Sequence, residues 1–264
     1  MCTVTFIPVR NGYHLGMNRD ERTSRPLASL PEVYARDAIE SIYPWDLEGG
    51  TWVGVNSVGN AFTLLNWNDT EVLQAKVHSR GSVIPALIGA SNTQAAHSTL
   101  CNLDLQGILP FTLVGFFVEQ EAAVMWRWDQ RSLQSELVPW KMRQWCSSSL
   151  SDAQASLQRG KAFAMAACES GGGSRDWLRR LHSSHAPGDR PFSTCVHRGG
   201  VQTVSYTELT CTGRRVKCKY VVGSPCQVAG MTHCVSIPRI PVLGQLQAWK
   251  ERPTRGSFRL SVVP

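Results

Sequence analysis

The sequence lacks an apolar segment long enough to cross a membrane as a helix. Its longest apolar stretch, residues 108–118, has about half the length that a bilayer requires, and Pro110 and Gly115 interrupt it. The N-terminus also lacks a basic region followed by an apolar run, which argues against a secretory signal. We therefore expect a soluble, cytoplasmic protein with no integral membrane segment.

Paired cysteine spacing is also missing, although the chain has nine cysteines, an odd number. The cysteines of residues 211–234 lack the CxxC spacing of a zinc site, and there is no CxxCH for covalent haem. We expect mostly reduced thiols, as in a cytoplasmic protein. His197 follows Cys195 on an expected strand, and we interpret this pair as a buried thiol beside a hydrogen-bonded histidine. No metal site is predicted.

Concentrated positive charge is absent, although the net charge is +7. The basic residues are scattered, and the small clusters at residues 179–180 and 214–215 are typical of solvated faces. We therefore expect no nucleic-acid binding. With 264 residues, 42% of them hydrophobic and 18% charged, the chain can bury a substantial core, as ordinary globular proteins do.

The expected elements run from strands to helices and back to strands, without an internal repeat. Residues 22–48 contain a long loop rich in proline and charge. This order predicts an α+β fold in which sheets pack between helical layers, in one domain over residues 1–264. The expected strands are residues 3–9, 13–17, 51–56, 60–67, 111–118, 122–128, 192–197, 201–209 and 215–222, and the expected helices are 79–97, 153–168 and 176–182.

Cys2 is the first candidate for catalysis. Initiator methionine is routinely removed before a small residue, so we expect the mature chain to begin with Cys2. That residue would carry a thiol, ordinarily with a pKa of about 8.5, and an α-amine, ordinarily with a pKa of about 7.7–8.0. A neutral amine could take the thiol proton, which is the arrangement of N-terminal nucleophiles. The alternative is that Cys2 only begins an edge strand.

A tight-turn signal at Arg10-Asn11-Gly12 predicts a hairpin that brings a charged tetrad beside the terminus. If Asn11-Gly12 is a two-residue loop, Cys2 faces Glu21. If the loop has three residues, Cys2 faces Asp20. Either register places the tetrad Asn18-Arg19-Asp20-Glu21 next to the amine and the thiol.

Several segments together resemble one known family. Their combination resembles the NRDE family, also called the transport and Golgi organisation family, over most of the chain. They are similar, more distantly, to the choloylglycine hydrolase and penicillin V acylase group of N-terminal nucleophile hydrolases. The resemblance implies a four-layer αββα sandwich of antiparallel sheets and cleavage of non-peptide amide bonds. The segments are Met1-Cys2-Thr3, Asn18 to Glu21, Gly50 to Asn56, Ser79-Arg80-Gly81, Trp145 to Leu150, Phe192 to Arg198 and Thr203 to Thr207.

The resemblance assigns roles to four residues as the catalytic set. By the acylase pattern, Cys2 matches the nucleophile, Asp20 the aspartate that orients the terminal amine, and Asn66 the oxyanion-hole amide. From the sequence alone, Asn66 could equally be a loop asparagine that caps local backbone. The acylase arginine falls on Met17, but Arg19 shares that strand face and is expected to serve the same pocket.

A second set of residues is expected to bind substrate. Most of them lie in the motifs that carry the resemblance. Ser148 or Ser149 and Arg159 are weak matches for a further acylase asparagine and a late arginine. The set is Asn18, Glu21, Trp52, Asn56, Ser148, Ser149 and Arg159.

Two functions follow from these expectations. The leading prediction is hydrolysis of a small-molecule amide or acyl compound, with no cofactor required. The alternative is a non-enzymatic protein that binds haem or another hydrophobic metabolite, because NRDE relatives are linked to haem handling. No haem ligand is predicted from the sequence, and neither the substrate nor the oligomeric state is predicted.

Overall fold

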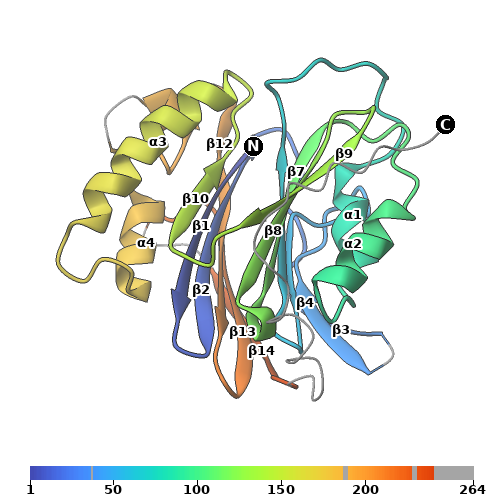
Figure 1. Cartoon of the computed structure of the whole chain (residues 1–264). Helices are drawn as coiled ribbons and strands as arrows, with labels where there is room; N and C mark the ends of the chain where they lie inside the picture. Colours follow the sequence, from blue (N-terminus) through green and yellow to red (C-terminus); the bar gives the residue numbers. More distant parts are fainter. Residues whose placement is uncertain (37, 187–189, 228–230, 241–264) are drawn as a thin grey trace.

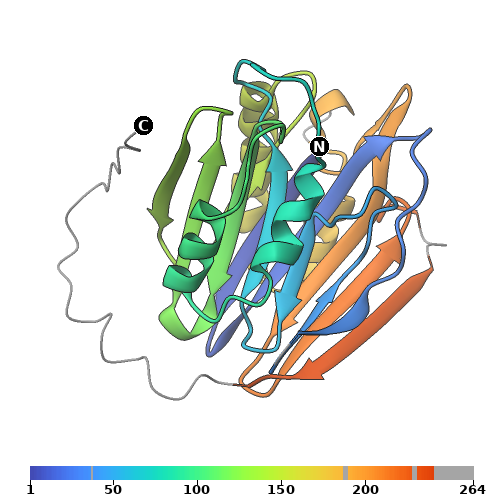
Figure 2. The same ribbon diagram turned by 90° about the vertical axis from the view of Figure 1, so that its right-hand side faces the viewer.

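Two antiparallel sheets of seven strands each form the centre of the molecule. The computed structural model describes residues 1–36, 38–186, 190–227 and 231–240. Figure 1 and Figure 2 show the sheets packed face to face, with α3 and α4 covering one outer face and α1 and α2 covering the other. The predicted α+β class and four-layer αββα sandwich are confirmed.

The first sheet contains both ends of the described chain. Its strand order is β10-β1-β2-β12-β13-β14, and β11 pairs with β12. The strands are β1 (Cys2–Val9), β2 (Gly12–Arg22), β10 (Arg143–Cys146), β11 (His197–Arg198), β12 (Val201–Cys211), β13 (Arg215–Val222) and β14 (Thr232–Pro238).

The second sheet keeps its strands in chain order, from β3 to β9. Each strand pairs antiparallel with the next one, as short connections favour. The strands are β3 (Glu32–Arg36), β4 (Ile39–Tyr43), β5 (Val53–Asn56), β6 (Ala61–Asn66), β7 (Phe111–Phe117), β8 (Ala122–Trp128) and β9 (Leu133–Val138).

Helices α2, α3 and α4 begin at polar side-chain caps. The hydroxyl of Ser151, for example, accepts a hydrogen bond from Gln154 N at 3.1 Å at the start of α3. Within the described part of the chain, no helix has the length and apolar character needed to span a bilayer. The helices are α1 (Val83–Leu87), α2 (Thr93–Cys101), α3 (Asp152–Ala167) and α4 (Arg175–Ser183), with short 3₁₀ turns η1 (Arg80–Ser82), η2 (Val118–Gln120) and η3 (Arg190–Phe192).

Three apolar clusters fill the three spaces between the four layers. The largest lies between the sheets, where Phe6 of β1 stacks on Phe116 of β7 with ring centroids 4.6 Å apart. A second cluster packs α1 and α2 on the second sheet. The third packs Trp177 and Leu178 of α4 against Ile7 of β1. Successive side chains of β1 point to opposite faces of the sheet, and both faces are packed against other layers. This first strand is therefore covered on both sides.

Three sequence predictions differ from the structure. The predicted helix over residues 79–97 is split into η1, α1 and α2, and the Asn92 side chain starts α2 by accepting a hydrogen bond from Ala95 N at 2.8 Å. The predicted loop over residues 22–48 contains β3 and β4. In the predicted strand 192–197, only His197 lies in a strand, because the carbonyls of residues 192 and 193 accept hydrogen bonds from a side chain of α3.

Candidate active site at the chain terminus

Cys2 begins the strand β1 between its two neighbours in the first sheet. It pairs with Arg19 of β2 on one side, and on the other its backbone bonds to Ser147, just after β10. Cys2 N donates to Ser147 Oγ at 3.2 Å, and Ser147 N donates to Cys2 O at 2.9 Å. The Cys2 side chain is only 5% exposed. The sheet therefore fixes the backbone of this residue on both sides.

Both predicted hairpin registers are wrong. Cys2 pairs with Arg19, not with Asp20 or Glu21, because the two-residue loop is Arg10-Asn11 and Val9 pairs with Gly12. Asn11 supplies the left-handed turn conformation, with φ 59°. Gly12 belongs to the strand instead, where an added Cβ would lie 2.1 Å from the carbonyl oxygen of Cys211. The glycine thus permits the close approach of β12.

The Arg19 side chain lies between the sheets, on the same face as Cys2. Its guanidinium carbon is 4.1 Å from the centre of the Trp52 ring, which is a cation–π contact. Arg19 also donates to the carboxylate of Asp46 and lies 3.8 Å from Glu21. Burial opposes ionisation of Asp46, but hydrogen bonds from Glu48 N and Arg25 outweigh it and lower the pKa of Asp46. Arg19 is therefore held in place by an ionised partner.

Asp20 points to the opposite face of the first sheet, toward α3. Its carboxylate accepts a hydrogen bond from Thr203 Oγ1 at 2.7 Å and one from Arg159 Nη2 at 3.3 Å. Burial raises the pKa of Asp20, while Arg159 and the positive terminal amine each act to lower it. Its backbone holds the chain end, because Met1 N donates to Asp20 O at 3.0 Å and Asp20 N donates to Met1 O at 2.8 Å.

Arg159 of α3 is fully buried behind the terminus, with 1% exposure. Besides Asp20, it donates to Thr3 Oγ1 at 2.7 Å and to the carbonyl of Ser193 at 3.1 Å. These contacts are all on the helix side of the sheet. Arg159 therefore supports the strands that carry Cys2 and Asp20. It does not line the cleft that opens beside Cys2 on the other side of the sheet.

A cleft of about 330 Å³ opens beside Cys2. Asn66 reaches it from the end of β6 in the second sheet, and also lines a neighbouring cleft of about 290 Å³. Arg80, which carried part of the family resemblance but was assigned no role, lines the first cleft and donates to the carbonyl of Pro110 at 3.1 Å. The first cleft brings together six predicted site residues: Cys2, Arg19, Glu21, Trp52, Asn66 and Ser149.

Three further predicted site residues make local structural contacts outside this cleft. The Asn18 amide donates to the carbonyls of His182 and Thr194 at 2.8 and 2.9 Å. The Asn56 amide donates to two carbonyls in the loop between α1 and α2. Ser148 Oγ accepts from Leu150 N at 3.3 Å. These bonds hold loops against the sheets.

The environment of Cys2 favours the protonated form of its thiol. Burial raises its pKa and is the largest effect. The positive amine of Met1 and Arg19 lower the pKa, but Asp20 and Glu21 oppose them and burial dominates. A reaction at this sulfur therefore needs a base that takes the proton.

Met1 lines the cleft beside Cys2. Its sulfur accepts from Ser149 N at 2.7 Å and from Arg198 Nη2 at 2.9 Å. Arg198 comes from β11 and was not predicted as a site residue, although the segment Phe192 to Arg198 belongs to the resemblance. With Met1 in place, these two donors contact its sulfur.

Comparison with known proteins identifies the family and the fold. Residues 1–176 match the family model described as Transport and Golgi organisation 2. None of the curated proteins matches the sequence. Penicillin V acylase from Agrobacterium tumefaciens has a similar structure, with a TM-score of 0.51 and 10% identity, over 89% of this chain and 86% of the acylase. The mutant C2A conjugated bile acid hydrolase from Clostridium perfringens matches with a TM-score of 0.49 and 9% identity, over 89% of this chain and 92% of the hydrolase.

Proposed function

We propose that this chain, which belongs to the transport and Golgi organisation 2 family and has the fold of N-terminal nucleophile hydrolases, hydrolyses a small-molecule amide or related acyl compound. The observation that carries the proposal is that Cys2, Arg19 and Asn66 line one cleft although they come from different strands and both sheets. Cys2 is the nucleophile. The penicillin V acylase with the same fold suggests an acyl substrate of similar small size.

The reaction begins once Met1 has been removed and the amine of Cys2 is free. That amine takes the thiol proton, and the sulfur attacks the acyl carbon. Asn66 donates a hydrogen bond to the oxyanion that forms. The protonated amine then gives its proton to the leaving amine, which departs as the thioester forms. Water hydrolyses the thioester, which releases the carboxylic acid and restores the thiol.

The charge of the cleft favours a substrate with an anionic group. Five basic side chains line it, against three acidic ones. All three acids are already paired, because Asp46 and Glu21 lie beside Arg19 and Arg25, and Glu48 binds Lys76. Arg80 makes no ion pair with any described residue and is the first candidate to bind that anionic group.

We further propose a cytoplasmic location, which the nine free cysteines support, since structural disulfides persist mainly in oxidising compartments. The reaction requires no cofactor. The alternative function is binding of haem or another hydrophobic metabolite, and the experiment below distinguishes it from hydrolysis.

Covalent trapping of Cys2 tests the proposal. Intact mass first establishes that Met1 is absent. A small acyl electrophile such as a β-lactone is then expected to add once to the protein, and peptide mapping is expected to find the adduct on Cys2. The Cys2→Ala variant should lose the adduct and keep its unfolding temperature. Cys101→Ala, which removes an exposed cysteine, should keep the adduct.

Two results would contradict the hydrolase. One is a native protein that retains Met1, since the base would then be missing. The other is a Cys2 that labels no faster than Cys101. Stoichiometric uptake of haem with a Soret band, in a protein whose Cys2 does not react, would favour the carrier instead.

Asn66 provides a second test, on the rate of the chemical step. If Asn66 donates only to the oxyanion, Asn66→Ala should lower kcat by about 10²–10³ and leave KM nearly unchanged. The measurement is steady-state hydrolysis of an amide found by library screening. The matched control is Asn68→Ala, because Asn68 lines neither cleft and its amide donates to Asp152 at 2.9 Å. A rise in KM alone would show ground-state binding instead.

A further inference from the structure

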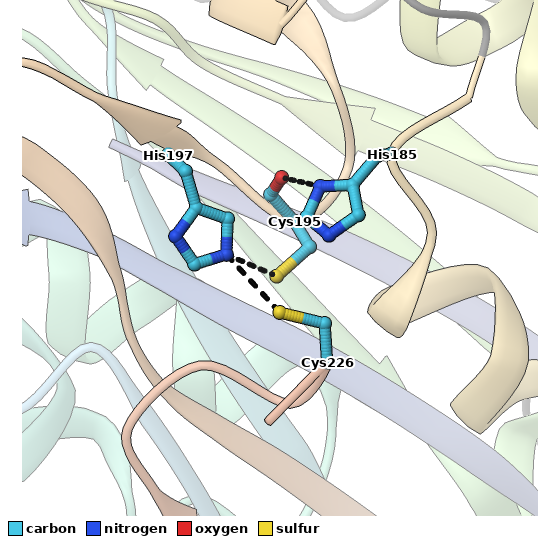
Figure 3. Close-up of side chains that lie close together, drawn as sticks. All are labelled: His185, Cys195, His197 and Cys226. Carbon is cyan, nitrogen blue, oxygen red and sulfur yellow. Dashed lines mark hydrogen bonds between the residues drawn. The ribbon is translucent and has the colours of Figure 1, made fainter. Parts of the chain in front are cut away.

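Four side chains with metal-ligand chemistry meet at a second site, away from the cleft. They are His185 after α4, Cys195 before β11, His197 in β11 and Cys226 after β13. One ligand atom from each lies within 4.8 Å of every other. Figure 3 shows the two sulfurs and the two rings converging on one point. None of the four lines the cleft beside Cys2.

The nitrogen atoms are oriented as ligands would be. His197 Nε2 lies 3.6 Å from Cys195 Sγ and 3.1 Å from Cys226 Sγ (Figure 3). His185 Nδ1 lies 3.1 Å from the carbonyl oxygen of Cys195. A carbonyl only accepts, so Nδ1 of His185 carries the proton and Nε2 presents its lone pair. A histidine whose second nitrogen donates to a carbonyl is the usual support for a metal ligand.

We propose that His185, Cys195, His197 and Cys226 bind one Zn²⁺ ion in a tetrahedral site. Zn–S bonds of about 2.3 Å and Zn–N bonds of about 2.0–2.1 Å place tetrahedral ligands roughly 3.3–3.8 Å apart. The two sulfur–nitrogen separations at His197, 3.6 and 3.1 Å, are already close to this range. His185 is exposed, so its side chain can move until Nε2 lies at bonding distance from the ion.

The donor set favours zinc and a structural role. Two thiolates and two imidazoles in tetrahedral geometry are typical of zinc. Two thiols lose their protons to solvent when they bind, and the two negative charges balance the charge of the ion. Four protein ligands leave no open position for water or substrate. The sequence analysis predicted no metal site, because the four ligands come from segments that only the fold brings together.

The ion would clamp the structure that supports Asp20. Val196, between Cys195 and His197, donates its N–H to Thr203 Oγ1 at 2.9 Å. The same hydroxyl donates to Asp20 at 2.7 Å. Near Cys226, Ser224 Oγ donates to the carbonyl of Thr203 at 2.7 Å. The clamp therefore joins three segments around Thr203, and this inference holds whether or not Cys2 is a nucleophile.

Titration with Co²⁺ tests the site on the full-length, reduced protein. One equivalent of Co²⁺ should produce thiolate charge-transfer bands in the near ultraviolet and the intense visible bands of tetrahedral cobalt. One equivalent of Zn²⁺ should abolish both. Protein purified without chelator should contain one zinc by elemental analysis. Cys195→Ser should weaken Co²⁺ binding by more than about 100-fold, since loss of supporting contacts alone costs 10–100-fold.

The matched control is Cys101→Ser. Cys101 Sγ also lies near a histidine, 3.5 Å from His97 Nε2, but these two are not part of a four-ligand group among the described residues. This variant should bind one Co²⁺ unchanged. Because Cys195 is buried and its loss could impair folding, the exposed His185→Gln is the second variant and should also weaken binding.

Three results would overturn the inference. They are a reduced protein that gives no cobalt bands, equal affinity in the wild type and His185→Gln, and a Cys195–Cys226 disulfide found by mapping of the protein isolated under non-reducing conditions. The first would show that the cluster binds no metal. The second would place the metal elsewhere, and the third would make the pair of cysteines a covalent link instead of two ligands.

Discussion

Adjacent residues of the charged tetrad serve opposite faces of one strand. Arg19 and Glu21 face the cleft, whereas Asn18 and Asp20 face the helices. Alternation along a strand makes this division unavoidable. The tetrad is therefore two half-sites, one that contacts the cleft and one that holds the sheet and the chain end from behind.

Replacing Arg19 tests the cleft half of the tetrad. Arg19 lowers the pKa of the Cys2 thiol, so its loss should raise that pKa and move the pH profile of Cys2 alkylation to higher pH. Arg19→Met should therefore react several-fold more slowly than wild type at neutral pH and approach the wild-type rate in alkaline solution. The measurement is the rate of iodoacetamide labelling of Cys2 against pH.

The control for this experiment is Arg10→Met. Arg10 lies in the exposed turn at the far end of the same hairpin. Its profile should match that of wild type. Coincident profiles for Arg19→Met and wild type would mean that the guanidinium does not act on the thiol.

The sequence could predict that the hairpin brings the charged tetrad beside Cys2, but not that Arg19 is the residue paired with it. Arg19 and Asn66 were assigned to the site by the family resemblance. The contacts of Asn56 could not be predicted from the sequence, because they are with carbonyls 32 and 34 residues away along the chain. Arg80 stood in a quoted motif, but only the fold shows that it reaches the cleft.

At the scale of elements, the β1–β2 hairpin depends on a glycine outside its turn. Turn chemistry at Asn11-Gly12 correctly predicted the hairpin and gave the wrong register. The reason is the third strand: β12 approaches Gly12 so closely that a side chain there would meet backbone. Sequence patterns within two strands cannot report that contact.

Gly12→Ala should destabilise the protein by about 1–3 kcal/mol, the usual cost of overpacking. The added Cβ would lie 2.1 Å from the oxygen of Cys211, so strands must shift apart. Urea unfolding measures the loss. Gly213→Ala, where no atom lies within 4 Å of the added Cβ, should be nearly neutral. Equal stability of the two variants would show that β12 accommodates the methyl group.

Other elements were predicted as far as periodicity allowed. Strands β7 and β8 and helices α3 and α4 match their predicted ranges closely. The strands have clear apolar runs, and the helices begin at polar capping residues. Strand β3 was missed because it is largely exposed, and β4 is buried only over its last three residues; their pairing makes them strands.

For the whole molecule, one buried arginine connects the helical layer to the sheet. Arg159 of α3 binds β1 through Thr3, β2 through Asp20 and the loop before β11 through Ser193. Breaking a buried ion pair leaves an uncompensated charge. The cohesion of this half of the molecule therefore depends on a polar network as well as on apolar packing.

Arg159→Met should lower the free energy of unfolding by about 3–5 kcal/mol at neutral pH. The folded state would then hold the Asp20 proton to higher pH than the unfolded state does, so stability falls as pH rises above the unfolded pKa. The loss should be smaller at pH 4 than at pH 7, and Asp20→Asn in the same chain should restore part of it. Urea unfolding at both values measures this.

The surface pair Arg131–Glu71 provides the control, with both side chains at least 70% exposed. Arg131→Met should change stability by less than about 0.5 kcal/mol at either pH. A loss for Arg159→Met that is independent of pH and persists in the double variant would assign the effect to packing of the arginine stem.

The anchoring of Met1 has a consequence for biosynthesis. Its sulfur contacts Ser149 and Arg198, which follow it by 148 and 197 residues. At roughly 5–20 residues per second, the ribosome needs about 7–30 s to reach the first of them. During that interval neither Ser149 nor Arg198 is present to hold the Met1 side chain. We therefore expect an aminopeptidase to remove Met1 more easily from the nascent chain than from the folded protein.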